Sequence, residues 1–148
     1  MFTPSRDQAR RFFFDVWAKY RAGQPLAGVE RTALEVVLAH PEYHALLEAP
    51  ERHRDRDYPP EAGETNPFLH LSLHLALAEQ LTIDQPRGLR ERYQRLLARL
   101  GDTMHAQHAS IDCLGETLWR AQRDQSPVDE KIYLACLDRL LGEPDSRP

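Results

Sequence analysis

The chain has 148 residues, of which 41% are hydrophobic and 28% are charged, so it can bury a core and keep a charged surface. Its formal net charge of -4 argues against a protein built to coat nucleic acid, because such proteins carry a clustered basic surplus. The longest uncharged stretch, residues 65–78, is shorter than a membrane span of about 20 residues. Charged residues stand near the N-terminus, where a signal peptide is apolar, so we expect a cytoplasmic protein.

Helix signals dominate the sequence from end to end. We expect an all-α fold, a single-domain helical bundle of five or six helices over residues 1–141. Residues 49–66 have no apolar period and are predicted to form a long polar loop, and residues 142–148 a frayed tail. The first helix is predicted to start after Thr3-Pro4 and to end at Gly23. The later helices are predicted over 27–40, 68–81, 89–100, 102–123 and from Ser126-Pro127 to about residue 140, with a short helical start over 41–48 that follows the proline break.

The segment 68–81 is ambiguous, because leucines alternate with other residues from Leu69 to Leu77, which is the period of a strand. We interpret it as a helix, since Leu and Ala form helices well and no second strand is available to pair with it. Its start is marked by Asn66-Pro67, a capping residue followed by a proline.

The two cysteines, Cys113 and Cys136, are too few and too far apart in sequence to predict a disulfide framework or a metal site of the CxxC type. The chemistry that remains is that of histidines and carboxylates.

Six of the seven histidines fall in three close pairs, His40 and His44, His70 and His74, and His105 and His108. Side chains three or four residues apart lie on one helix face, which is how helical bundles build metal sites. His40 and His44 flank Pro41, and there a histidine that interacts with a helix end is the preferred interpretation over a ligand.

The segment 102–123 gives the strongest signal, because His105, His108, Asp112 and Glu116 share one sector of the helix with apolar neighbours. We therefore expect these four groups on the buried side, where they are costly unless they are paired or bind an ion. The predicted metal ligands are His70, His74, His105, His108, Asp112 and Glu116.

Imidazole and carboxylate ligands suit a divalent metal, and we favour non-haem iron, as one ion or two, over zinc or manganese. The expected role is redox chemistry or the binding of a small molecule. Two alternatives stay open: a zinc-dependent hydrolase with Asp112 or Glu116 as the base, and a metal-free interaction module whose histidines form a structural polar network.

Two surfaces could bind partners. The aromatic residues from Phe12 to Tyr20 predict core packing first and a homodimer or protein interface second. Five arginines between Arg87 and Arg99 could contact an acidic partner, but the acidic balance of the chain favours a solvated face.

Several motifs together resemble a proteobacterial family known as domain-of-unknown-function family 1841. The resemblance covers nearly the whole chain and implies a small bacterial cytoplasmic protein, with no activity attached. The motifs that carry it are Phe2-Thr3-Pro4-Ser5-Arg6-Asp7, His40-Pro41-Glu42-Tyr43-His44, Asn66 to His74, Asp84-Gln85-Pro86, and the run from Gly101-Asp102 through His105, His108, Asp112, Gly115 and Glu116 to Trp119.

Overall fold

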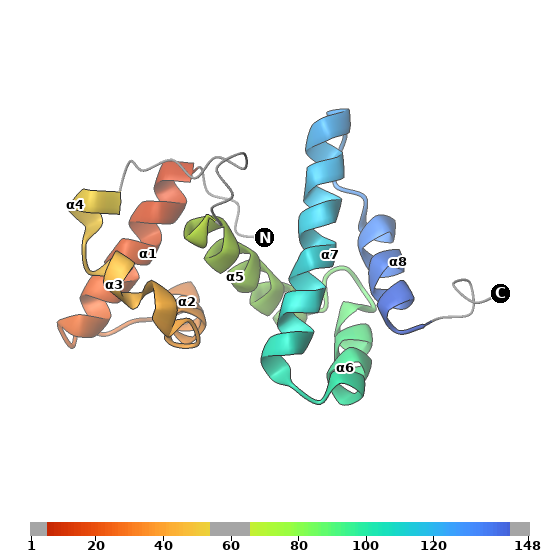
Figure 1. Ribbon diagram of the computed structural model, residues 1–148, viewed down its shortest axis with the longest axis horizontal. Coiled ribbons are helices and arrows are strands. Elements are labelled where there is room, and N and C mark those ends of the chain that lie inside the picture. Colours follow the sequence, from red (N-terminus) through yellow and green to blue (C-terminus); the bar gives the residue numbers. More distant parts are fainter. Residues whose placement is uncertain (1–5, 54–65, 143–148) are drawn as a thin grey trace. The chain divides into compact units, whose positions relative to one another are not determined.

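The structure, a computed structural model, describes residues 6–53 and 66–142 (Figure 1). Within these ranges every regular element is a helix, so the predicted all-α fold is confirmed. Six of the helices have ten residues or more, which agrees with the expected number. The elements are α1 Arg6–Arg21, α2 Val29–Leu38, the 3-10 helix η1 Pro41–Tyr43, α3 His44–Leu47, α4 Pro50–His53, α5 Pro67–Ile83, α6 Leu89–Leu100, α7 Thr103–Asp124 and α8 Glu130–Leu140.

The chain divides into two compact units, Met1–Leu75 and Ala76–Pro148, and the boundary between them falls inside α5. Each unit is considered by itself below, and the single domain expected over residues 1–141 stays a prediction. In the part of the chain that the structure describes, no helix combines the length and the apolar character that a membrane crossing needs.

The core of the first unit is built from the aromatic face of α1. Phe13 and Trp17 are buried there, and the ring of Phe14 lies 5.4 Å from that of Phe68 on α5. Burial of large aromatic side chains is the main stabilising contribution that this helix can make. The core-packing interpretation is therefore confirmed for Phe13, Phe14 and Trp17, whereas Tyr20 at the end of the helix is exposed. The core residues are Phe13, Phe14, Val16, Trp17, Ala33, Val37, Leu47, Phe68, Leu71 and Leu75.

The connection between α2 and α5 differs in part from the prediction. The second helix ends at Leu38, and a separate helical turn begins at Pro41, because proline lacks a donor and crowds the preceding turn. The predicted polar loop over 49–66 is wrong at its start, where Pro50–His53 forms the short helix α4. Residues 54–65, the Thr3-Pro4 cap and residues 143–148 of the expected tail lie outside the described residues.

The start of α5 is fixed by a side-chain cap. The Asn66 Oδ1 atom accepts hydrogen bonds from the backbone N–H groups of Phe68, at 3.0 Å, and Leu69, at 3.2 Å. The first backbone N–H groups of a helix have no intrahelical partner, and the Asn66 side chain satisfies two of them. Pro67 has no backbone N–H, so it leaves no donor unsatisfied. The predicted Asn66-Pro67 start is therefore confirmed.

In the second unit α6, α7 and α8 pack against one another in pairs (Figure 1). The buried side chains between them include Leu96, Leu114 and Leu137. One buried polar contact joins α8 to the end of α5, where the Tyr133 hydroxyl donates to Gln80 Oε1 at 2.8 Å. Burial also raises the pKa of Tyr133, so the phenol keeps its proton.

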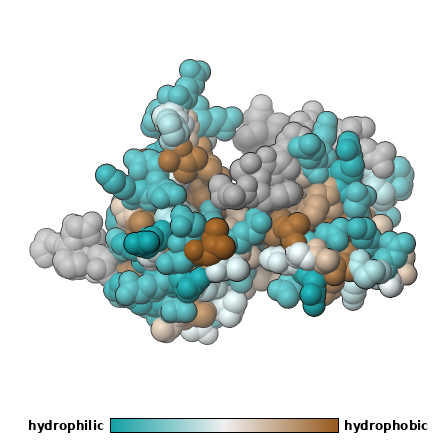
Figure 2. Space-filling view, turned by 180° about the vertical axis from the view of Figure 1, so that it is seen from behind, coloured by the Kyte–Doolittle hydropathy of each residue, from teal (hydrophilic) through white to brown (hydrophobic). Residues whose placement is uncertain are grey.

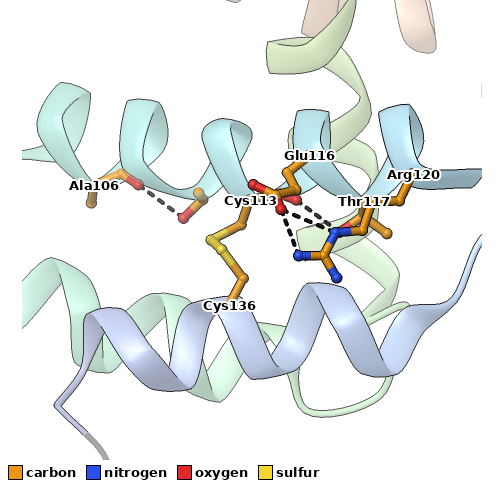
Figure 3. Close-up of a disulfide and its surroundings, with 7 residues drawn as sticks. Ala106, Cys113, Glu116, Thr117, Arg120 and Cys136 are labelled. Atoms are coloured by element: carbon orange, nitrogen blue, oxygen red, sulfur yellow. Dashed lines mark hydrogen bonds and ion pairs between the residues drawn. A yellow bond between two sulfur atoms is a disulfide. The ribbon is translucent and has the colours of Figure 1, made fainter. Parts of the chain in front are cut away.

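A disulfide between Cys113 and Cys136 joins α7 to α8 (Figure 3), with 5.7 Å between the two Cα atoms. The two cysteines predict neither a disulfide framework nor a CxxC metal site from the sequence, and the single disulfide that they form was missed. They are 23 residues apart in sequence, but the two helices lie side by side, so the distance along the chain does not measure the distance in space.

Three arginines of α6 donate hydrogen bonds to residues of neighbouring segments. Arg90 donates to the carbonyl oxygens of Leu81 and Thr82, which end α5 without intrahelical partners. Arg92 makes a two-point contact with Asp138 of α8, at 2.8 and 3.4 Å.

Arg99 donates to the carbonyl oxygen of Leu141. These arginines therefore act within the second unit and not simply as a solvated face. The start of α8 is also corrected, because its capping residue is Asp129, which accepts from Lys131 N–H, and not Ser126.

Hydrophobic residues on the face drawn in Figure 2 form separate patches among hydrophilic ones. Among the exposed large side chains, Trp119 is 56% accessible and carries the Arg123 guanidinium 4.8 Å above its ring. On α1, Tyr20 is the exposed aromatic residue, at 42%. A homodimer or partner interface through α1 stays a prediction.

Candidate metal centre

Three imidazole rings meet in the first unit. The ring centres of His40 and His74 are 4.5 Å apart, those of His70 and His74 are 4.7 Å apart, and those of His40 and His70 are 5.1 Å apart. The rings meet edge to face, with interplanar angles of 68° to 80°. His40 and His74 are buried, and His70 is half-buried. We call these three residues the histidine cluster.

Two different local structures supply the cluster. His70 and His74 stand one turn apart on α5, in the register that the Asn66 cap sets. His40 precedes Pro41 and has an extended backbone, with φ of -125° and ψ of 67°. A residue before proline is pushed out of the helical region by the proline ring, so the side chain of His40 leaves the phase of α2.

The protonation of the His40 ring follows from its hydrogen bond. Its Nδ1 atom lies 2.8 Å from the carbonyl oxygen of Val36, which can only accept, so Nδ1 carries the proton. The other ring nitrogen, Nε2, is buried and is the atom left to bind a metal. Metal-binding histidines in proteins are oriented in this way, with the distal N–H donating to a carbonyl or carboxylate.

The spacing of the ring nitrogens suits a single cation. One ligand nitrogen from each of the three histidines lies within 4.8 Å of the others, and the Nε2 atoms of His70 and His74 are 3.2 Å apart. Metal–nitrogen bonds of 2.0–2.1 Å in a tetrahedral arrangement put neighbouring ligand nitrogens about 3.3 Å apart. The cluster is thus a group of neutral ligands that could hold a metal ion after small movements.

The residues around the cluster have other partners. The Tyr43 ring is parallel to that of His40 at 5.7 Å, and burial, followed by the charge of Glu42, raises the pKa of Tyr43. His44 lies outside the cluster, because its Nε2 atom donates to the carbonyl oxygen of Val37 at 2.8 Å and its ring packs on Trp17 at 4.4 Å. His44 therefore has a structural role.

Of the six predicted ligands, the structure brings His70 and His74 together within the first unit. The other four lie on α7 of the second unit. His108 is half-buried, whereas His105, Asp112 and Glu116 are exposed, so the predicted burial of these three side chains is wrong. Glu116 forms an ion pair with Arg120 at 2.8 Å (Figure 3). Their role as ligands stays a prediction.

The physical reason for this error is the composition of the buried face of α7. That face contains Ser110 and Thr117, whose hydroxyl groups donate to the carbonyl oxygens of Ala106 and Cys113, at 2.9 and 2.8 Å. A hydroxyl that bonds within its own helix can be buried at little cost. The face of α7 that packs therefore includes two hydroxyl side chains, and most of the predicted ligands lie on the opposite, exposed side.

His40 is the residue that sequence reasoning did not include among the ligands. Its position directly before Pro41 is the signal that could have found it, because the proline displaces the side chain from the helical phase. A helical projection cannot place such a residue.

A family model described as a domain of unknown function, DUF1841, matches residues 5–139. The chain belongs to this family. The match confirms the resemblance drawn from the sequence motifs, and the family carries no known function. No curated protein and no solved structure matches the chain. The histidine cluster is therefore the feature of the described residues that bears on function.

Proposed function

We propose that this protein binds one divalent transition-metal ion through His40, His70 and His74. The observation that supports the proposal is the approach of three imidazoles in a largely buried site, with two Nε2 atoms 3.2 Å apart. Placing three titratable rings together in a protein interior is costly unless they share hydrogen bonds or an ion. The compactness of the cluster favours one ion over a pair.

A fourth protein ligand is proposed from the sequence prediction on α7. His108 is the first candidate, because its side chain is half-buried whereas those of His105, Asp112 and Glu116 are exposed. Metal ligands are rarely fully solvated, and Glu116 already pairs with Arg120. We rank His108 above the other three for this reason.

Neutral imidazole ligands suit iron, zinc, copper and nickel, whereas manganese prefers oxygen ligands. Iron, the metal favoured by the sequence argument, would give a redox or small-molecule-binding role in the cytoplasm. Zinc fits the tetrahedral spacing of the ligand nitrogens equally well. The zinc-hydrolase alternative loses support, because both acids considered as the base are exposed on α7.

One rival is favoured by a specific observation. The 3.2 Å distance between the Nε2 atoms of His70 and His74 also suits an N–H···N hydrogen bond in a metal-free polar network. Elemental analysis of the purified protein separates the two functions. A metal-binding protein contains close to one equivalent of metal, and its melting temperature rises when iron(II) or zinc is added to the apoprotein.

Four His-to-Gln variants sharpen this test. His40→Gln, His70→Gln and His74→Gln each remove a ligand and should weaken zinc binding at least tenfold, as measured by competition with a chelator. His44→Gln is the matched control, since it lies in the same part of the chain, keeps a side-chain N–H donor and should bind zinc like the wild type. A metal-free protein whose melting is unchanged by both metals would overturn the proposal.

A further inference from the structure

We infer that the ion held by the histidine cluster takes a small monovalent anion as an additional ligand. This inference rests on the metal site proposed above and specifies what that site binds. It follows from the charge of the ligands, the surroundings of the cluster and the accessibility of the three rings.

The charge of the cluster is the first argument. All of its ligands are imidazoles, which bind a metal in their neutral form, so a divalent ion keeps its full charge of +2. Among the residues that the structure describes, no carboxylate or thiolate belongs to the candidate ligand group. The acids nearest in sequence to His40 are Glu35 and Glu42, and both are exposed.

An uncompensated charge of this kind is unfavourable in a protein interior. Metal sites usually reduce it by including carboxylate or thiolate ligands. Where the ligands are neutral, an anion from solution can supply the missing negative charge directly at the ion. The bound ion should therefore bind an anion more strongly than it would in a site that contains an acidic ligand.

Accessibility sets the size of the anion. His40 is 2% exposed and His74 is 3% exposed, so their side of the cluster is closed to solvent. His70 is the half-buried member and offers the remaining access. Because only His70 offers access, we expect an anion of one to three atoms rather than a bulky one.

The probe for this inference is azide, added to the full-length protein loaded with cobalt(II), whose visible absorption reports its ligands. Sodium perchlorate at the same concentration is the control, because it coordinates weakly and screens charge equally. We expect a saturable change in the cobalt spectrum with azide. We also expect cobalt(II) to bind at least tenfold more tightly in about 100 mM azide than in perchlorate, because a ligand of the bound state strengthens binding.

The outcomes are distinguishable. If cobalt(II) binds with one equivalent but its spectrum and affinity are the same in azide and perchlorate, the anion inference is overturned and the metal site stands. If cobalt(II) does not bind, the proposed function fails and the anion inference fails with it. His44→Gln should respond to azide like the wild type, because His44 lies outside the histidine cluster. The perchlorate control separates binding of azide from a general effect of added salt.

Discussion

Reduction of the Cys113–Cys136 disulfide should destabilise the second unit by about 3 kcal/mol. The bond closes a loop across a sequence separation of 23 residues. In the chain-entropy model, closing a loop of this length removes about 11–12 cal/mol/K from the unfolded ensemble, or about 3.4 kcal/mol at 25 °C. Cys113 is 2% exposed, so its thiol stays packed in the reduced protein and adds little of its own.

The assay is urea denaturation of the wild-type protein with and without dithiothreitol, followed by circular dichroism. With an m-value of about 2 kcal/mol/M, the midpoint of the affected transition should fall by about 1.5 M urea on reduction. The variant in which both cysteines are Ser is the control and should not respond to the reductant. If the reductant shifts the wild type no more than this variant, the reasoning is refuted.

Three further predictions concern single contacts. Asn66→Ala removes the cap of α5 and should lower the free energy of unfolding by about 1 kcal/mol in urea denaturation, and an unchanged midpoint would contradict the capping role. Because burial raises the pKa of Tyr133, the folded protein keeps the phenol proton while the unfolded chain loses it above about pH 10, so stability is full below this pH and falls as the pH rises beyond it. Tyr133→Phe should reduce this fall of stability with pH, and it should lower the free energy of unfolding at pH 7 by about 1–3 kcal/mol because the side-chain amide oxygen of Gln80 loses the hydroxyl donor. If denaturation at pH 7–11 shows the same pH dependence for the variant and the wild type, the buried Tyr133 phenol is not its source. Asp138→Asn weakens the partly exposed pair with Arg92 and should cost up to about 1 kcal/mol, less in 1 M salt, and a loss that does not depend on salt would contradict an ionic contribution.

Local signals in the sequence predicted the helix boundaries best. Asn66-Pro67 and Gly101-Asp102 mark the starts of α5 and α7, because a capping side chain satisfies backbone donors only two or three residues away. The Ser126-Pro127 motif misled, since Asp129 takes the same role three residues later. Where two residues within one turn of each other can both cap, the sequence alone does not choose between them.

Which side of a helix is buried was harder to predict than where the helix begins and ends. On α7 the predicted ligands share a sector roughly half a turn away from the buried face formed by Ala106, Ser110 and Leu114. By residue type alone, Ser110 is polar and is expected on the exposed side of α7, although it is buried. Burial depends on the hydrogen bonds that each side chain can make within its own helix, and these depend on the structure.

Contacts between distant segments were not available from the sequence. The approach of His40 to His74 joins two elements on either side of a long connection, and the Cys113–Cys136 bond joins two neighbouring helices. In both cases the tertiary fold brings residues together that no local spacing relates. Local spacing did relate His70 and His74, which are one turn apart on α5 and lie with their Nε2 atoms 3.2 Å apart.

The histidine cluster draws its members from both sides of residues 54–65, because His40 precedes this stretch and His70 and His74 follow it. The same is true of the core, in which Phe14 contacts Phe68. A chain cut by a protease within this stretch would therefore yield two fragments that share one core and divide the ligands between them. If the metal site proposed above forms, zinc or iron would strengthen their association beyond what the shared core provides, and a chelator would weaken it.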